Sequence, residues 1–208
     1  MQNITKITEN YIRTHPAIKQ SIKNNIINYS KLARLISKEK NIKNFDAILI
    51  ACRRYYDKIK KSKFEVSIID LLKKSRLSIR NKIAVVILEP HVRSKILLDL
   101  QKEIDEKNEI MRVVKGESGI TLVITEDFLD KIEKKFKNNI LKISNNLVEI
   151  TIKSSERLEN IPGVTAYIYS LFGENDINIQ ETLSCWTDTI IIINKGDLPK
   201  SMDLLNFD

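Results

Sequence analysis

The stretch from Leu147 to Phe207 constrains the fold of this chain more than any other part of it. Residues 147–152 alternate apolar and polar side chains, as a strand with one buried face requires. After the turn Ile161-Pro162-Gly163, apolar residues recur at helical spacing as far as Gly173. The sequence therefore predicts a strand at 147–152, a helix at 164–173, strands at 177–179 and 189–193, and an amphipathic segment at 198–207.

The same order of elements is predicted once before, between Lys82 and Ser144. Apolar residues alternate from Leu77 to Ile87, and Pro90 stands where a helix can start favourably. A hairpin, a helix capped by Thr125 and a short strand follow. The predicted elements are strands at 77–87, 110–114, 120–124 and 140–143, with helices after Pro90 and after Thr125, before a turn at Ser144-Asn145-Asn146.

The first third of the chain has helical spacing and an excess of basic residues. The His15-Pro16 step interrupts the first helix, since the residue before a proline avoids the helical conformation. From Met1 to Ser75 there are 17 Lys and Arg against 6 Asp and Glu, a balance of +11, whereas the remainder has 18 against 21, or −3. Because spacing and charge both change after Ser75, we predict domains at residues 1–75, 76–146 and 147–208.

The basic excess indicates an acidic partner, of which nucleic acid is the commonest. A short helix with Leu32, Leu35 and Ile36 inside, the polar turn at 41–44 and a longer helix at 45–61 resemble a helix-turn-helix module in outline. The second helix carries the residues that we predict to bind nucleic acid: Arg53, Arg54, Lys58, Lys60 and Lys61. A three-helix cap with solvated charges would show a similar pattern, and this alternative stays open.

The C-terminal stretch resembles the ACT domain, the small ligand-binding regulatory module of aspartate kinases and other enzymes of amino-acid metabolism. The residues that carry the resemblance are Ile161-Pro162-Gly163-Val164, Asn175-Asp176-Ile177-Asn178-Ile179 and Thr187-Asp188-Thr189-Ile190-Ile191-Ile192. The preceding copy is similar to a second, divergent ACT unit. The resemblance implies an α+β fold, in which an all-helical, helix-turn-helix-like segment precedes two ferredoxin-like βαββαβ units, the second lacking its last strand.

The chain as a whole is similar to a group of archaeal proteins regarded as predicted regulators of amino-acid metabolism. This similarity depends mainly on residues 29–36, on residues 47–55 and on the C-terminal unit. Another segment or another chain is expected to complete the second sheet. We predict a homodimer, because an open strand edge invites pairing.

The resemblance implies an amino acid as the ligand. The first N–H groups of a helix lack partners within it and its dipole favours an anion, so the turn at Pro162-Gly163 suits a carboxylate. In the ACT family the effector lies between this turn and the start of the adjacent strand, commonly where two units pack side by side. Carried over, the ligand-binding positions are Asn160, Pro162, Gly163, Val164, Asp176, Asn178 and Ile179.

Asp176 and the corresponding turn of the first unit need separate expectations. Asp176 is placed to meet the ammonium group of the effector, although an ordinary turn residue is the alternative interpretation. In the first unit the corresponding turn, at residues 88–92, lacks the glycine and has Glu89 where an anion would be repelled. We therefore expect the first unit to be structural.

Other kinds of chemistry find little support in the sequence. His15 and His91 each adjoin a proline, and neither has a nucleophile arranged beside it. There is no phosphate-binding glycine loop and no metal-ligand cluster, and we expect Cys52 and Cys185 to be buried as small hydrophobic residues. No apolar run approaches the length of a membrane span, and the N-terminus lacks a signal-peptide core. We expect a cytoplasmic, non-enzymatic protein without cofactor, metal or membrane partner.

The leading hypothesis is a regulator in which tandem ACT-like units sense an amino acid and the basic helical segment acts on a partner such as DNA. A regulatory subunit that docks on a metabolic enzyme is the first alternative. A structural dimer without a ligand is the second.

Overall fold

The chain forms two separate units. The computed structural model describes residues 3–59 and 64–207, and the division between the units falls after Lys63. This division precedes the predicted boundary at residues 75/76, because a helix at 64–73 belongs to the C-terminal unit. Among the described residues, no helix has the length and apolarity that crossing a membrane requires.

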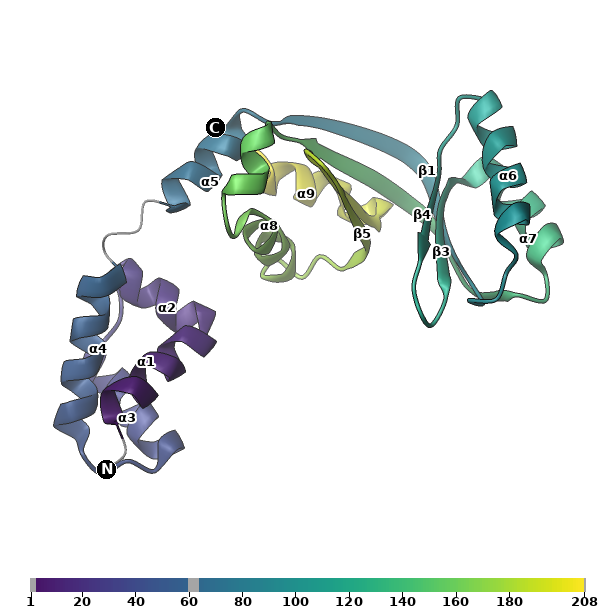
Figure 1. The fold of residues 1–208 in the computed structure, drawn as a ribbon. Helices are drawn as coiled ribbons and strands as arrows, with labels where there is room; N and C mark the ends of the chain where they lie inside the picture. Colours follow the sequence, from purple (N-terminus) through teal and green to yellow (C-terminus); the bar gives the residue numbers. More distant parts are fainter. Residues whose placement is uncertain (1–2, 60–63, 208) are drawn as a thin grey trace. The chain divides into compact units, whose positions relative to one another are not determined.

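Helices alone build the described part of the N-terminal unit (Figure 1): α1 (Ile4–Thr14), α2 (Pro16–Lys23), α3 (Tyr29–Lys40) and α4 (Phe45–Ile59). The side chains of Asn3, Asn28 and Asn44 accept hydrogen bonds from first-turn N–H groups of α1, α3 and α4. Pro16 opens α2, where its missing N–H costs nothing. Local chemistry therefore sets the start of each of these helices.

The core of the N-terminal unit is formed by Tyr11, Ile12, Ile22, Leu32, Ala33, Ile36, Ile42, Ile48 and Cys52. Leu35, which was predicted to face inward, is 41% exposed instead. Leu32, Ala33 and Ile36 already fill the inner side of α3. Burial raises the pKa of the Cys52 thiol to about 11, so this cysteine stays protonated and packs as a small hydrophobic residue.

One antiparallel sheet with strand order β2-β3-β1-β4-β6-β5 organises the C-terminal unit. Its strands are β1 (Arg76–Leu88), β2 (Met111–Lys115), β3 (Ile120–Thr125), β4 (Ile140–Lys153), β5 (Ile179–Cys185) and β6 (Asp188–Asn194). The helices are α5 (Phe64–Lys73), α6 (Ser94–Glu106), α7 (Leu129–Phe136), α8 (Val164–Gly173) and α9 (Leu198–Leu204). Three short 3-10 helices complete the unit: η1 (Glu126–Phe128), η2 (Glu156–Asn160) and η3 (Lys195–Asp197).

Strands β1 and β4 run on from one four-stranded half of the sheet into the other (Figure 1). Residues 83–88 of β1 pair with β3, and residues 140–147 of β4 complete that half. Residues 76–80 of β1 pair with residues 149–153 of β4, which pair in turn with β6. The second half therefore has the order β1-β4-β6-β5. Its last strand, which the sequence seemed to lack, is the beginning of β1.

The predicted turn at Ser144-Asn145-Asn146 is wrong, because β4 passes through it without ending. Asn146 has φ +56°, and Lys82 in β1 has the same value. The register between β1 and β4 shifts beside these residues, between Arg80 and Val85. Both strands thus bulge where they pass from one half of the sheet to the other.

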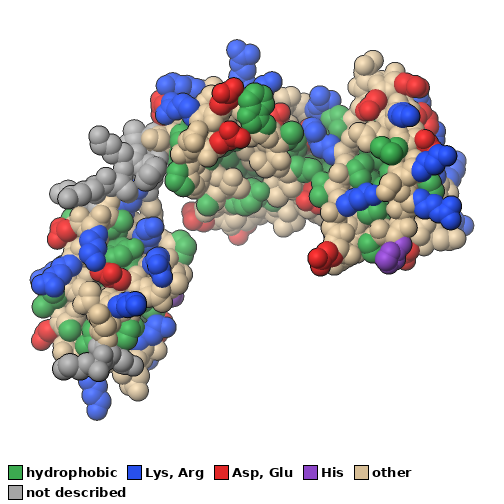
Figure 2. All heavy atoms as spheres, in the orientation of Figure 1, with side chains coloured by type: hydrophobic (Ala, Val, Ile, Leu, Met, Phe, Trp, Pro, Cys, Tyr) green, Lys and Arg blue, Asp and Glu red, His purple; other side chains and the backbone are tan. Residues whose placement is uncertain are grey.

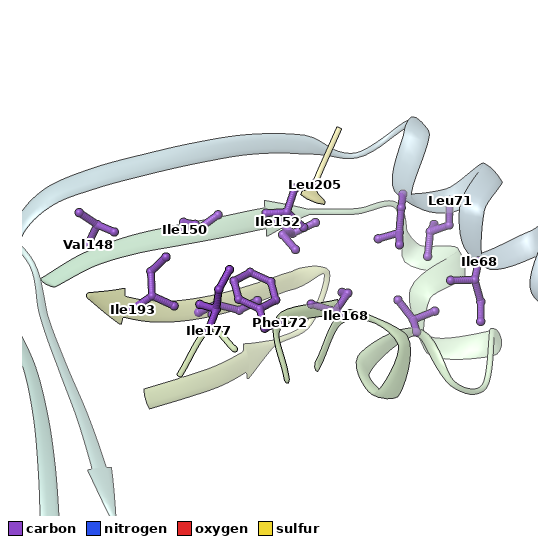
Figure 3. Packing of buried hydrophobic residues seen from close by; sticks show 13 residues of the cluster. Ile68, Leu71, Val148, Ile150, Ile152, Ile168, Phe172, Ile177, Ile193 and Leu205 are labelled. Atoms are coloured by element: carbon purple, nitrogen blue, oxygen red, sulfur yellow. The ribbon is translucent and has the colours of Figure 1, made fainter. Parts of the chain in front are cut away.

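Each half of the sheet is covered by helices on one face. Helices α6 and α7 pack on the first half, over a core that includes Leu100, Leu122 and Ile132. In the second half, Ile150 and Ile152 of β4 pack against Ile168 and Phe172 of α8, and Leu205 after α9 joins the same core (Figure 3). Ile68 and Leu71 of α5 join this second core, which explains why the division between the units precedes α5.

The opposite faces of the two halves share a third cluster, made of Ile83, Val85, Val123, Leu147 and Ile192. Beside it, the Arg112 guanidinium in β2 donates two hydrogen bonds of 3.0 Å to the carboxylate of Glu149 in β4. The Glu149 side chain is 1% exposed. This ion pair joins a strand of the first half to a strand of the second.

Candidate functional site

The start of α8 requires a glycine. Gly163 is the N-cap residue and has φ +95°, a conformation that side chains with a Cβ rarely adopt. A Cβ added there would meet only the Ile68 Cδ1 atom, at 3.7 Å, so backbone conformation and not crowding selects glycine. The turn at Pro162-Gly163 and the helix at 164–173 lie where the sequence predicts them.

The first turn of α8 has backbone N–H groups without partners in the helix. The Tyr167 N–H donates to the Gly163 carbonyl at 2.9 Å and begins the helical hydrogen bonding. Among the described residues, no side chain caps the N–H groups of Val164, Thr165 and Ala166. These N–H groups and the helix dipole give this end of α8 a partial positive charge.

A hollow of about 570 Å³ lies at this end of α8. Its walls come from three places: η2, the first turn of α8, and the β5–β6 hairpin. The lining residues include Leu158, Glu159, Gly163, Thr165, Ser184 and Trp186. The hollow therefore places a carboxylate, an aromatic ring and a positive helix end around one space.

Of these six residues, only Gly163 was among the predicted site residues, and the polar or aromatic ones that the prediction missed include Glu159, Ser184 and Trp186. Trp186 is the only tryptophan of the chain, and it is 64% exposed with φ +50° in the turn between β5 and β6. A single tryptophan beside the predicted hairpin turn is a signal in the sequence that could have identified it. For Glu159 and Ser184 the sequence has no such signal, because only the fold brings them beside α8.

The predicted ligand residues fall into two groups that the described chain does not bring together. Gly163 and Val164 line the hollow, and Asn160 and Pro162 are exposed just before α8. Asp176, Asn178 and Ile179 follow the other end of α8, whose ten residues span about 15 Å. Asp176 has φ +58° and its N–H donates to the Gly173 carbonyl at 3.3 Å, as in an ordinary turn after a helix.

The turn at residues 88–92 of the first half is built differently. The Glu89 carboxylate accepts a hydrogen bond of 3.0 Å from the Asn139 side-chain amide. The Glu89 N–H donates a second hydrogen bond, of 2.8 Å, to the Asn139 carbonyl. Helix α6 begins at Ser94 and not at Pro90. Glu89 therefore closes the turn against the end of α7 with its side chain.

The predicted nucleic-acid residues lie on α4, as far as the structure describes them. Arg53, Arg54 and Lys58 are exposed, and Lys58 forms an ion pair with Glu9 of α1. Lys60 and Lys61 lie outside the described residues. Helix α4 contacts α1, α2 and α3 and buries Ile48, Ala51 and Cys52 against them.

A second hollow, of about 840 Å³, lies on the N-terminal unit between α1, the end of α3 and Tyr55. Lys6, Arg13 and Lys40 line it together with Glu9, whose carboxylate is already held by Lys58. Burial and the nearby Glu9 carboxylate raise the pKa of the Tyr55 hydroxyl. This side of the unit is therefore positively charged.

The position of Cys185 differs from the prediction. It is exposed at the end of β5, whereas the sequence placed it among buried residues. Strand β5 forms one edge of the described sheet, so a residue at its end has no neighbouring strand to cover it. A bulge between Ile179 and Glu181 also shifts the register of this edge strand.

Comparison with solved structures shows a fold like that of the regulatory subunits of aspartate kinases. Aspartate kinase from Clostridium acetobutylicum, an allosteric enzyme, matches 62% of this chain with a TM-score of 0.52 and 15% identity, and this chain spans only 33% of that enzyme. The regulatory subunit of aspartate kinase from Thermus thermophilus, in a ligand-free form, matches 64% of this chain over 95% of its own length, with a TM-score of 0.50 and 13% identity. The corresponding subunit from Thermus flavus matches 62% over 94%, with a TM-score of 0.50 and 11% identity.

These likenesses are likenesses of fold. No protein-family model matches the sequence. No curated protein matches it either.

Proposed function

We propose that this chain is a non-enzymatic regulatory protein that binds an amino acid at the start of α8 and acts through nucleic acid bound by its N-terminal unit. The observation that carries the proposal is the uncapped first turn of α8, which opens on a hollow beside Glu159 and Trp186. The likeness of the fold to the regulatory subunit of aspartate kinase supports a role in amino-acid metabolism.

An α-amino acid matches the charges around the hollow. Its carboxylate would accept hydrogen bonds from the free N–H groups at the start of α8, where the dipole favours an anion. Its ammonium group would meet the Glu159 carboxylate, which takes the place that the sequence assigned to Asp176. The Trp186 ring would cover the remainder of the ligand and exclude water from these contacts.

The second group of predicted residues leads us to propose a homodimer. Asp176, Asn178 and Ile179 stand at the start of β5, which is an edge strand of the described sheet. Edge strands have unpaired backbone groups that pair readily with a second copy. A second chain at this edge would add its own residues to the site. Sedimentation equilibrium should then give the mass of two chains.

The position of Trp186 makes the amino-acid proposal directly testable. We expect its fluorescence to change in a saturable way when at least one of the twenty amino acids is added to the full chain. Glu159→Gln should weaken that binding at least about tenfold, because a charge-assisted hydrogen bond contributes about 1.5–3 kcal/mol. Glu156→Gln is the matched control, since Glu156 is exposed on the same short helix and does not line the hollow.

Two results would count against this proposal. If no amino acid changes the fluorescence and the protein still sediments as a dimer, the structural dimer without a ligand becomes the better interpretation. If both glutamine variants bind equally well, the ligand does not use Glu159. Docking on a metabolic enzyme remains the alternative for the N-terminal unit, and salt-dependent DNA binding separates the two.

A further inference from the structure

Helix α4 is poorly placed to enter a groove of nucleic acid. Its inner residues Ile48, Ala51 and Cys52 are buried, and it contacts α1, α2 and α3. Its outward residues are Asp46, Ile50, Arg53, Arg54, Asp57 and Lys58. Two carboxylates therefore balance two guanidiniums on the exposed side, and Lys58 is already paired with Glu9.

The outward face of α3 has a different composition. At 100° per residue, Lys31, Arg34, Leu35 and Lys38 fall within an arc of about 100°. All four are exposed, and the buried side of the helix lies opposite them. None of the three cations has an ion pair to another described residue. On the visible face of the N-terminal unit, Figure 2 shows Lys and Arg side chains together with some Asp and Glu side chains.

The one acidic residue of α3 does not disturb this face. Glu39 accepts a hydrogen bond of 2.9 Å from the Tyr11 hydroxyl, and at 100° per residue it lies about 40° outside the arc. The loop that leads into α3 has three exposed asparagines, Asn24, Asn25 and Asn28. A cationic stripe with amide groups at its start is complementary to phosphate oxygens.

We propose that α3, through Lys31, Arg34, Leu35 and Lys38, is the helix that binds double-stranded DNA, and that α4 supports it from behind. This inference rests on the nucleic-acid part of the proposed function. Twelve residues give α3 a length of about 18 Å. The major groove of DNA is about 12 Å wide and admits a helix, and an exposed leucine suits contact with thymine methyl groups. Duplex RNA has a major groove too narrow for side chains to read.

The test compares two variants of the full chain with the same loss of charge. One is Lys31→Gln/Arg34→Gln/Lys38→Gln on α3, and the other is Arg53→Gln/Arg54→Gln/Lys58→Gln on α4. Binding to a labelled DNA duplex is followed by fluorescence anisotropy between 50 and 200 mM salt. Circular dichroism checks that both variants keep their helices, as substitution of exposed residues by glutamine should allow.

We expect the α3 variant to lose affinity on the order of a hundredfold near 0.1 M salt, with the slope of log K against log salt reduced by about 2.7. The α4 variant should stay within about threefold of the unaltered protein and keep its slope. Equal losses in both variants, or a larger loss on α4, would overturn the assignment to α3.

Two further outcomes concern the partner. If the unaltered chain binds no DNA even at 50 mM salt, both this inference and the nucleic-acid part of the proposed function fail, whereas the Trp186 titration is unaffected. If vesicles of anionic phospholipid bind as tightly as the duplex and compete with it, the face recognises anionic surfaces in general. That result would overturn the assignment to DNA.

Discussion

At the scale of single residues, Gly163 links the backbone to the candidate site. Its φ of +95° is what allows η2 to turn into α8 and leaves the first N–H groups of α8 free. We expect Gly163→Ala to lower the free energy of unfolding by about 1–2 kcal/mol, because a Cβ is disfavoured in the left-handed region. Urea denaturation of the full chain measures this change.

Gly173, at the other end of α8, is the matched control. Its φ is not positive, and a Cβ added there meets no atom within 4 Å. Gly173→Ala should therefore leave stability unchanged or raise it by up to about 1 kcal/mol, as alanine does in a helix. Equal effects of the two substitutions would mean that backbone conformation does not select glycine at position 163.

At the scale of elements, the Arg112–Glu149 pair joins β2 to β4 on the face of the sheet opposite the helices. The hydrogen bond to Glu149 raises the pKa of the Arg112 guanidinium, so this group keeps its positive charge. Arg112→Met should cost about 3–5 kcal/mol of unfolding free energy, because the buried carboxylate loses its partner. The double variant Arg112→Met/Glu149→Leu should recover most of that loss.

An exposed ion pair of the same unit serves as the comparison for the Arg112–Glu149 pair. Lys131 and Glu103 join α7 to α6 at the surface. Lys131→Met should cost less than about 1 kcal/mol, since exposed pairs contribute little. The role assigned to Glu149 would be wrong if Arg112→Met were as mild as Lys131→Met, or if the double variant were the least stable of all.

At the scale of the whole molecule, the two halves of the sheet are interlocked. Strand β1 supplies the last strand of the second half before it begins the first, and α5 packs into the core of the second half. We expect a fragment of residues 64–208 to fold, and a fragment of residues 147–208 to remain unfolded because β1 and α5 are missing from it. Circular dichroism and amide exchange distinguish these outcomes.

Two results with fragments would contradict the interlocking of the two halves. A stable, cooperatively folded fragment 147–208 would support the predicted domain boundary at 146/147 and would show that the second half folds without β1 and α5. A fragment 76–208 as stable as 64–208 would show that Ile68 and Leu71 add nothing to the core. Either result would be visible as the unfolding transition of the fragment.

The sequence by itself determined the elements whose information is local. Asn28 and Asn44 cap α3 and α4, Gly163 begins α8, and alternation marks the beginning of β1, because capping, left-handed backbone and one-sided burial each depend on near neighbours. Only the tertiary structure decided that Ser144-Asn145-Asn146 continues a strand, that the missing strand is the beginning of β1, and that α5 belongs with residues 147–208. The same holds for the hollow, where Glu159 and Trp186 meet α8. These features depend on pairing and packing between residues far apart in the chain, and no short window of sequence contains that information.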